Sequence, residues 1–88
     1  MNLQKATLAK IISDEYKFNG HHLEKENVVE IVERLTDIIN DKQIKESLID
    51  SFLRKLRIGA IGSLSKNPMD LVVKFYQFMD QNRPKLSS

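Results

Sequence analysis

Apolar side chains recur at intervals of three and four residues in four segments of the chain, a spacing that places them along one face of an α-helix. The segments run from about residue 3 to 18, 23 to 40, 41 to 57 and 67 to 83. No segment alternates apolar and polar side chains over the length of a strand. The pattern therefore predicts an all-α fold, a small four-helix domain over residues 1–83. The positions expected to face its core are Leu8, Ile11, Ile12, Tyr16, Val28, Ile31, Val32, Leu35, Ile38, Ile39, Ile44, Leu48, Ile49, Phe52, Leu53, Leu56, Leu71, Val72, Phe75, Tyr76, Phe78 and Met79.

Residues that favour helix ends lie between these segments. Asn19-Gly20 tolerates a left-handed backbone and is expected to end the first helix. Asp41 is expected to cap the start of the third helix, and Asn67-Pro68 the start of the fourth. Pro84 cannot continue a helix, so residues 84–88 are expected to form a flexible C-terminal tail.

The stretch from Arg57 to Pro68, RIGAIGSLSKNP, is small, apolar and rich in hydroxyl groups. Apolar spacing continues to Leu64, which predicts a third helix that is kinked or interrupted near Gly59 and followed by a short helical segment. The alternative is that the helix ends at Gly59 and a turn follows. The stretch contains G-x-x-G but lacks the G-x-x-x-x-G-K-[ST] pattern of a Walker phosphate loop. We therefore interpret it as a joint between helices and not as a phosphate site.

The chain has 88 residues and no cysteine, so disulfide bonds and thiolate metal sites are excluded. A domain of this size buries only about 60–65% of its unfolded surface, and a partner is a common further source of stability. Lys5 and Lys10 interrupt any apolar run near the N-terminus, and no window reaches the ~18 apolar residues that cross a bilayer. These features favour a cytoplasmic protein that does not enter membranes.

Charge is unevenly distributed although the net charge is only +2. Residues 1–40 carry five basic and seven acidic side chains, whereas residues 41–88 carry nine basic and five acidic ones. One acidic row, expected opposite the apolar face of the second helix, comprises Glu26, Glu30, Glu33 and Asp37. Such a row is usually solvated, but it could also dock a basic partner. A basic cluster near the end of the third helix comprises Arg54, Lys55, Arg57 and Lys66, and it is the candidate contact for nucleic acid phosphates.

Side chains that could support catalysis or hold a cofactor do not form a convincing set. His21 and His22 are adjacent, so they would point to different sides of a helix, and no further His or Cys accompanies them at a ligand spacing. No serine is flanked by a credible His and carboxylate pair. We predict a protein that is not an enzyme and has no cofactor or metal.

The fourth segment has an apolar face wider than a surface helix needs, because Val73 extends it at one margin. Part of that face would stay exposed in a monomer, and aromatic residues and methionine are enriched in interface cores. Partner contacts are therefore predicted at Val73, Phe75, Tyr76 and Met79. A central helix surrounded by the other three would explain the same pattern. The sequence favours a helical protein–protein interaction module, an adaptor or regulator that forms a homodimer or binds another protein. The alternative is a nucleic-acid-binding accessory protein.

Overall fold

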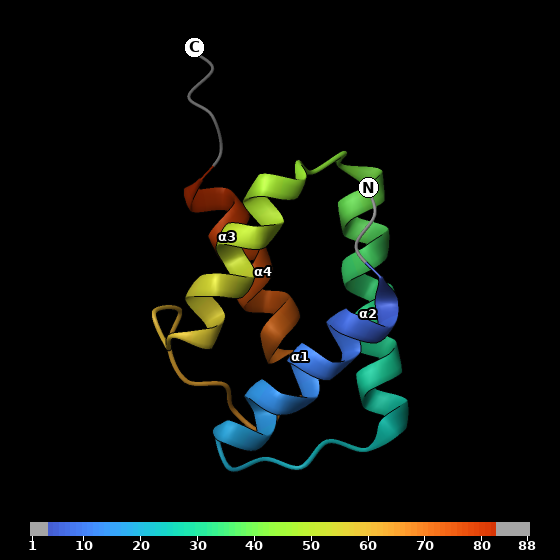
Figure 1. The fold of residues 1–88 in the computed structure, drawn as a ribbon, viewed down its shortest axis with the longest axis vertical. Helices are drawn as coiled ribbons and strands as arrows, with labels where there is room; N and C mark the ends of the chain where they lie inside the picture. The colour runs from blue at the N-terminus through green and yellow to red at the C-terminus, as the bar shows by residue number, and fades with distance from the viewer. Residues whose placement is uncertain (1–3, 83–88) are drawn as a thin grey trace.

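Four helices make up the fold in the computed structural model, which describes residues 4–82 (Figure 1). They are α1 (Lys5–Phe18), α2 (Lys25–Asp41), α3 (Glu46–Arg57) and α4 (Asp70–Gln81). The described residues contain no strand, so the predicted all-α, four-helix class is confirmed. The expected tail at residues 84–88 lies outside the described residues.

The helices enclose one apolar core. In Figure 1, α2 runs along one side, α3 and α4 lie side by side on the other, and α1 crosses the lower part of the molecule. The ring of Phe52 on α3 lies 5.0 Å from that of Phe75 and 5.4 Å from that of Phe78, both on α4. Leu35, at the centre of the α2 stripe, is 2% exposed. The apolar stripes read from the sequence therefore meet along the inner faces of all four helices.

The same backbone motif ends α1, α2 and α3. In this motif, called a Schellman motif, an N–H beyond the helix bonds back to a carbonyl five residues earlier, around one residue with positive φ. His21 N–H donates to Tyr16 O, and Ala60 N–H donates to Lys55 O. The positive-φ residue is Gly20 after α1 and Gly59, with φ of 76°, after α3. Glycine suits both positions because it lacks a Cβ atom.

After Gly59 the chain does not become helical again. The helix α3 ends at Arg57, and residues 58–69 form turns and an irregular loop. The expected short helical segment after Gly59 is therefore wrong, and the alternative of a helix end followed by a turn is the one observed. Leu64 is nevertheless 2% exposed. Its apolar spacing therefore predicted its burial correctly, although the residue lies in a loop and not in a helix.

The connection between α2 and α3 also differs from the expectation. Asp41 is the last residue of α2 and does not cap α3, which begins at Glu46. The reason is a Schellman end at Gln43, which has φ of 51°, with Ile44 N–H donating to Ile39 O. Among residues 4–82, Gln43 is the one residue other than glycine that has a positive φ.

The loop before α4 is held by buried and half-buried hydrogen bonds. Tyr16 is 0% exposed, and its hydroxyl accepts the Leu71 N–H at 3.1 Å. The same hydroxyl lies 2.9 Å from the carbonyl oxygens of both Asn67 and Pro68, to either of which it can donate. Burial raises the pKa of the Tyr16 hydroxyl, and the nearby Asp70 charge adds to that rise, although the Leu71 bond opposes it.

Two polar side chains of the loop and helix start complete this arrangement. The Asn67 side-chain oxygen accepts the Met69 N–H at 3.0 Å, so Asn67 acts at the predicted helix start although the helix itself begins at Asp70. Asp70 accepts the Ser65 N–H at 2.8 Å and lies 3.5 Å from the Lys74 ammonium. Burial would raise the pKa of Asp70, but these two contacts outweigh it and leave the pKa below its usual value.

Candidate interaction surface

The outer face of α4 carries exposed apolar side chains. Val73 is 48% exposed and Tyr76 is 49% exposed, one helical turn apart on the same side. Phe75 points the other way and is 1% exposed, because it packs edge-on against Phe52 in the core. Position around the helix explains the difference. Residues three apart, such as Val73 and Tyr76, lie on the same face, whereas adjacent residues, such as Phe75 and Tyr76, lie on different faces. Phe75 is thus a core residue and does not lie on the exposed face of α4.

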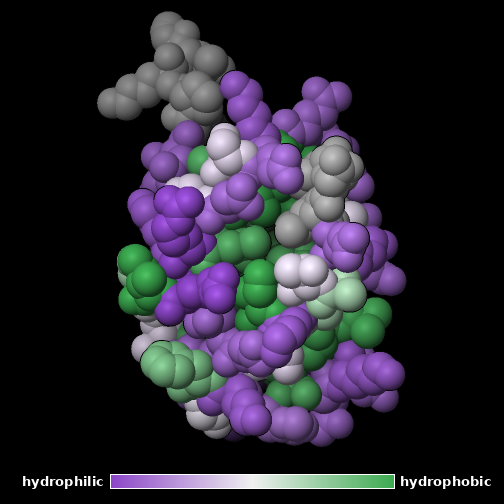
Figure 2. All heavy atoms as spheres, in the orientation of Figure 1, coloured by the Kyte–Doolittle hydropathy of each residue, from purple (hydrophilic) through white to green (hydrophobic). Residues whose placement is uncertain are grey.

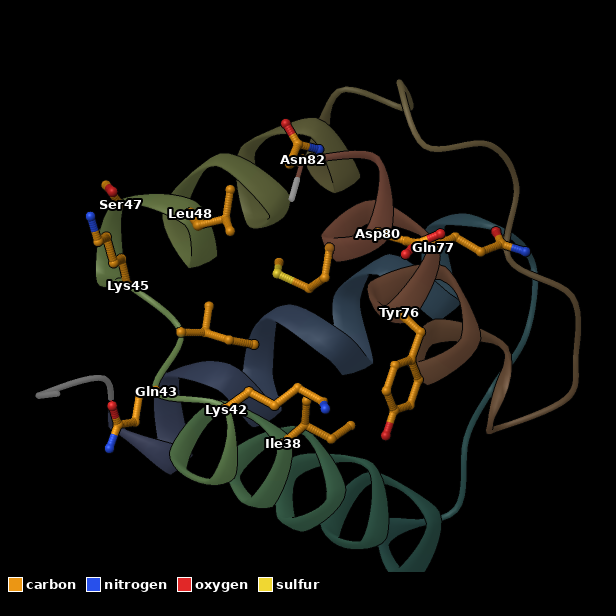
Figure 3. A pocket seen from close by; sticks show the side chains of 12 residues that line it. Ile38, Lys42, Gln43, Lys45, Ser47, Leu48, Tyr76, Gln77, Asp80 and Asn82 are labelled. Carbon is orange, nitrogen blue, oxygen red and sulfur yellow. The ribbon is translucent and has the colours of Figure 1, made fainter. Parts of the chain in front are cut away.

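Beside this face lies an open groove of about 830 Å³ between the C-terminal half of α4, the end of α2 and the start of α3 (Figure 3). The Tyr76 ring projects from α4 toward α2, where Ile38 and Lys42 lie. Figure 2 shows another face of the molecule, in the orientation of Figure 1, where hydrophobic side chains are visible between hydrophilic ones. The residues that line the groove are Ile38, Lys42, Gln43, Ile44, Lys45, Ser47, Leu48, Tyr76, Gln77, Met79, Asp80 and Asn82.

The floor of the groove is apolar and continuous with the core. Ile38, Ile44, Leu48 and Met79 are partly buried and pack against the core cluster. The structure thus places two predicted partner-binding residues, Tyr76 and Met79, in the groove, and leaves Val73 on the exposed face outside it.

Sequence reasoning missed the polar side of the groove, which includes Lys42, Lys45 and Ser47. No motif marks these residues. The sequence signal that could have indicated a groove here was Ile44. This apolar residue directly follows the turn at Gln43 and belongs to neither α2 nor α3.

The acidic row of α2 is solvent-exposed and separate from the groove. Glu26, Glu30, Glu33 and Asp37 are all exposed, and none of them lines the groove. Glu30 lies 3.5 Å from the Arg34 guanidinium, and both side chains are more than half exposed. An exposed pair of this kind contributes about 0–1 kcal/mol. The structure therefore does not bring the acidic row together with the α4 residues into one site.

The basic cluster is exposed at the end of α3, but part of it has partners within the molecule. The Lys55 ammonium lies 5.4 Å from the centre of the Phe78 ring, a cation–π distance. Burial raises the pKa of Glu15, and the Arg57 charge partly offsets this rise, which places Arg57 near α1. Arg54 and Arg57 both line a second, smaller hollow of about 480 Å³ between α1 and α3. Lys66 is exposed in the loop that follows α3.

Residues 4–82 show neither a metal-binding cluster nor a membrane-spanning helix. His21 is half-buried and His22 exposed, both in the connection between α1 and α2. Across these residues, no three or more His, Asp or Glu side chains converge as metal ligands would. None of the described helices combines the length and apolarity required to cross a bilayer.

Comparison with known proteins gave no match, either to a protein-family model, to a curated protein or to a solved structure.

Proposed function

We propose that this chain is a small, non-enzymatic protein–protein interaction module of the cytoplasm, an adaptor or regulator that self-associates through α4. The observation that carries the proposal is the pair of half-exposed apolar side chains, Val73 and Tyr76, on one face of α4. Other large apolar side chains are exposed too, namely Phe18, Val29 and Ile58, but each lies on a different element or loop. Among residues 4–82, α4 is the one helix on which two of them share a face.

Symmetry makes a second copy a suitable partner for this face. In a twofold dimer the same patch contributes from both chains, so two exposed apolar side chains become four at the contact. Tyrosine supplies a large contact area at a small cost in conformational entropy, and it is enriched among residues that dominate binding energy. A domain of 88 residues also has a limited core of its own, so the added burial is a significant gain.

Light scattering across a range of protein concentrations tests this proposal. The wild-type mass should rise from monomer to dimer, and a Val73→Glu/Tyr76→Glu variant should stay a folded monomer, because each chain would bury two carboxylates against the two of its partner. The matched control is Phe18→Glu/Val29→Glu, which adds the same two charges at apolar residues that are 84% and 47% exposed on α1 and α2. A wild type that remains monomeric at the highest concentration would contradict self-association.

Nucleic acid binding through Arg54, Lys55, Arg57 and Lys66 is the second candidate. It is favoured by one observation: Arg54 and Arg57 line the same hollow between α1 and α3. A mobility shift of DNA or RNA that weakens with salt, and that disappears in an Arg54→Gln/Arg57→Gln variant, would support it. Loss of the shift in the Val73→Glu/Tyr76→Glu variant instead would assign the binding to α4.

A further inference from the structure

The groove gathers apolar side chains that the sequence pattern assigns to the core. Six of the expected core positions are not fully buried, and five of these six line the groove: Ile38, Ile44, Leu48, Tyr76 and Met79. The sixth, Ile11, lines the smaller hollow. The incomplete burial is therefore concentrated at one place, where the ends of three helices leave the core open.

Basic side chains stand beside this apolar floor. Lys42 follows the last residue of α2 and Lys45 precedes the first residue of α3, so both lie on the same wall of the groove. In Figure 3 the Lys42 side chain extends along the mouth of the groove toward Ile38, and Lys45 stands at the opposite end of that wall. Asp80 is the one acidic lining residue, and Figure 3 shows it beside Gln77, away from both lysines.

We propose that this groove binds a single-chain aliphatic carboxylate, with the alkyl chain on the apolar floor and the carboxylate beside Lys42, while Lys45 adds positive charge at the other end of the same wall (Figure 3). The volume of about 830 Å³ falls within the range of small-molecule sites, which are mainly apolar with a few polar groups that orient the ligand. The alkyl chain would cover the side chains that the core leaves open. The Lys42 ammonium is the charge complement of a carboxylate, and neither Lys42 nor Lys45 forms an ion pair with another residue in the range 4–82.

The alkyl chain supplies most of the affinity in this arrangement, and the lysines supply the preference for an anion. Each fully buried methylene tightens binding about fourfold, and a half-buried one about twofold. Charge pairs that remain in contact with water contribute about two- to fivefold each and weaken as salt is added. Decanoate should therefore bind about fourfold more tightly than octanoate in this open groove.

The groove and the proposed dimer contact share Tyr76, but Val73 belongs to the contact alone, so Val73→Glu can weaken self-association without altering the lining of the groove. The two ideas can fail separately when the titration is made in the Val73→Glu variant as well as in the wild type. Binding that is equal in both variants would leave the groove proposal intact whatever the oligomeric state.

The experiment is a titration of the full chain with decanoate, followed by backbone amide NMR shifts. The expected shifts are at Ile38, Ile44 and Leu48, with decyltrimethylammonium at least threefold weaker. A Lys42→Glu/Lys45→Glu variant should lose the preference for decanoate and favour the cationic amphiphile. Lys5→Glu/Lys25→Glu makes the same charge change at exposed positions outside the groove and should keep the wild-type preference.

Three results would overturn the proposal. The first is equal binding of both amphiphiles by the wild type. The second is a set of shifts confined to the smaller hollow around Arg54 and Arg57. The third is groove shifts that follow protein concentration and not decanoate, which would mean that a second copy covers the groove.

Discussion

Replacing Tyr16 with phenylalanine should destabilise the fold, because the change removes one oxygen atom that serves three backbone groups at the start of α4. The Tyr16 hydroxyl accepts the Leu71 N–H at 3.1 Å and lies 2.9 Å from the carbonyl oxygens of Asn67 and Pro68. An N–H in the first turn of a helix has no acceptor within the helix. Phenylalanine keeps the packing of the ring, so the substitution isolates the hydrogen bonds.

The size of the effect follows from burial. Tyr16 and Leu71 are both 0% exposed, so water cannot easily replace the lost oxygen. A buried donor or acceptor left without a partner costs about 1–3 kcal/mol. With the Leu71 N–H and one carbonyl affected, we expect a loss of about 2–4 kcal/mol. A chain of 88 residues has a total stability of about 4–13 kcal/mol, so this is a large fraction.

Urea denaturation followed by circular dichroism measures this loss directly. The matched control is Tyr76→Phe, which removes the same hydroxyl from a side chain that is 49% exposed. Surface changes of that kind usually stay within about 0.5 kcal/mol of wild type. Equal denaturation midpoints for the Tyr16→Phe and Tyr76→Phe variants would refute the role given to the buried hydroxyl.

Alkaline pH provides a second measurement on the same group. Burial raises the pKa of Tyr16, so the folded protein holds this proton more tightly than the unfolded chain, in which tyrosine ionises near its ordinary value of about 10. The stability linked to Tyr16 is therefore complete below that value and decreases as the pH rises through the folded pKa. Tyrosinate absorbance in the Tyr76→Phe variant should report the raised pKa. The Tyr16→Phe variant should lack this alkaline loss of stability.

Three further substitutions test other parts of the fold. Leu35→Ala, at a residue 2% exposed in the centre of α2, should cost about 2–5 kcal/mol by urea denaturation, and an unchanged midpoint would contradict its place in the core. Gly59→Ala should lower the melting temperature by the equivalent of about 1 kcal/mol, because an alanine is strained at the φ of 76°. Space is not the cause, since no atom lies within 4 Å of an added Cβ. A raised melting temperature would contradict this helix end. Asp70→Asn should destabilise most at neutral pH. The lowered pKa of Asp70 means that its carboxylate stabilises the fold at pH values above its pKa in the unfolded chain, and this stabilisation is lost as the pH falls through the folded pKa. A difference in stability from wild type that does not shrink in acid would contradict this role.

The helices and their inner faces could be predicted because apolar periodicity reports burial directly. The stripe through Leu35 on α2 needed no tertiary information, and neither did the end of α1 at Gly20. The start of α3 could not be placed, because Gln43 adopts a positive φ that its residue type does not indicate. The same limit applies after Gly59, where Leu64 keeps an apolar spacing but reaches the core from a loop.

The candidate surface was only partly accessible to sequence reasoning. Val73 and Tyr76 stand out as a surplus of apolar residues on one helix, and both are half-exposed in the structure. Phe75 belongs to the same surplus by composition, but its phase on α4 turns it into the core. The groove itself arises from how the ends of three helices diverge, and that geometry has no signature in the sequence of any one of them.

The central claim is that the face of α4 that carries Val73 and Tyr76 is the contact between copies. The most direct test measures whether the α4 helices of two copies lie close together in solution. The chain has no cysteine, so Val73→Cys and Val29→Cys each introduce a single thiol at a valine of nearly equal exposure, 48% and 47%. Treatment with a short bismaleimide should link the Val73→Cys variant into dimers rapidly, and the Val29→Cys variant should remain largely monomeric. Equal rates of cross-linking in the two variants would contradict a contact through α4.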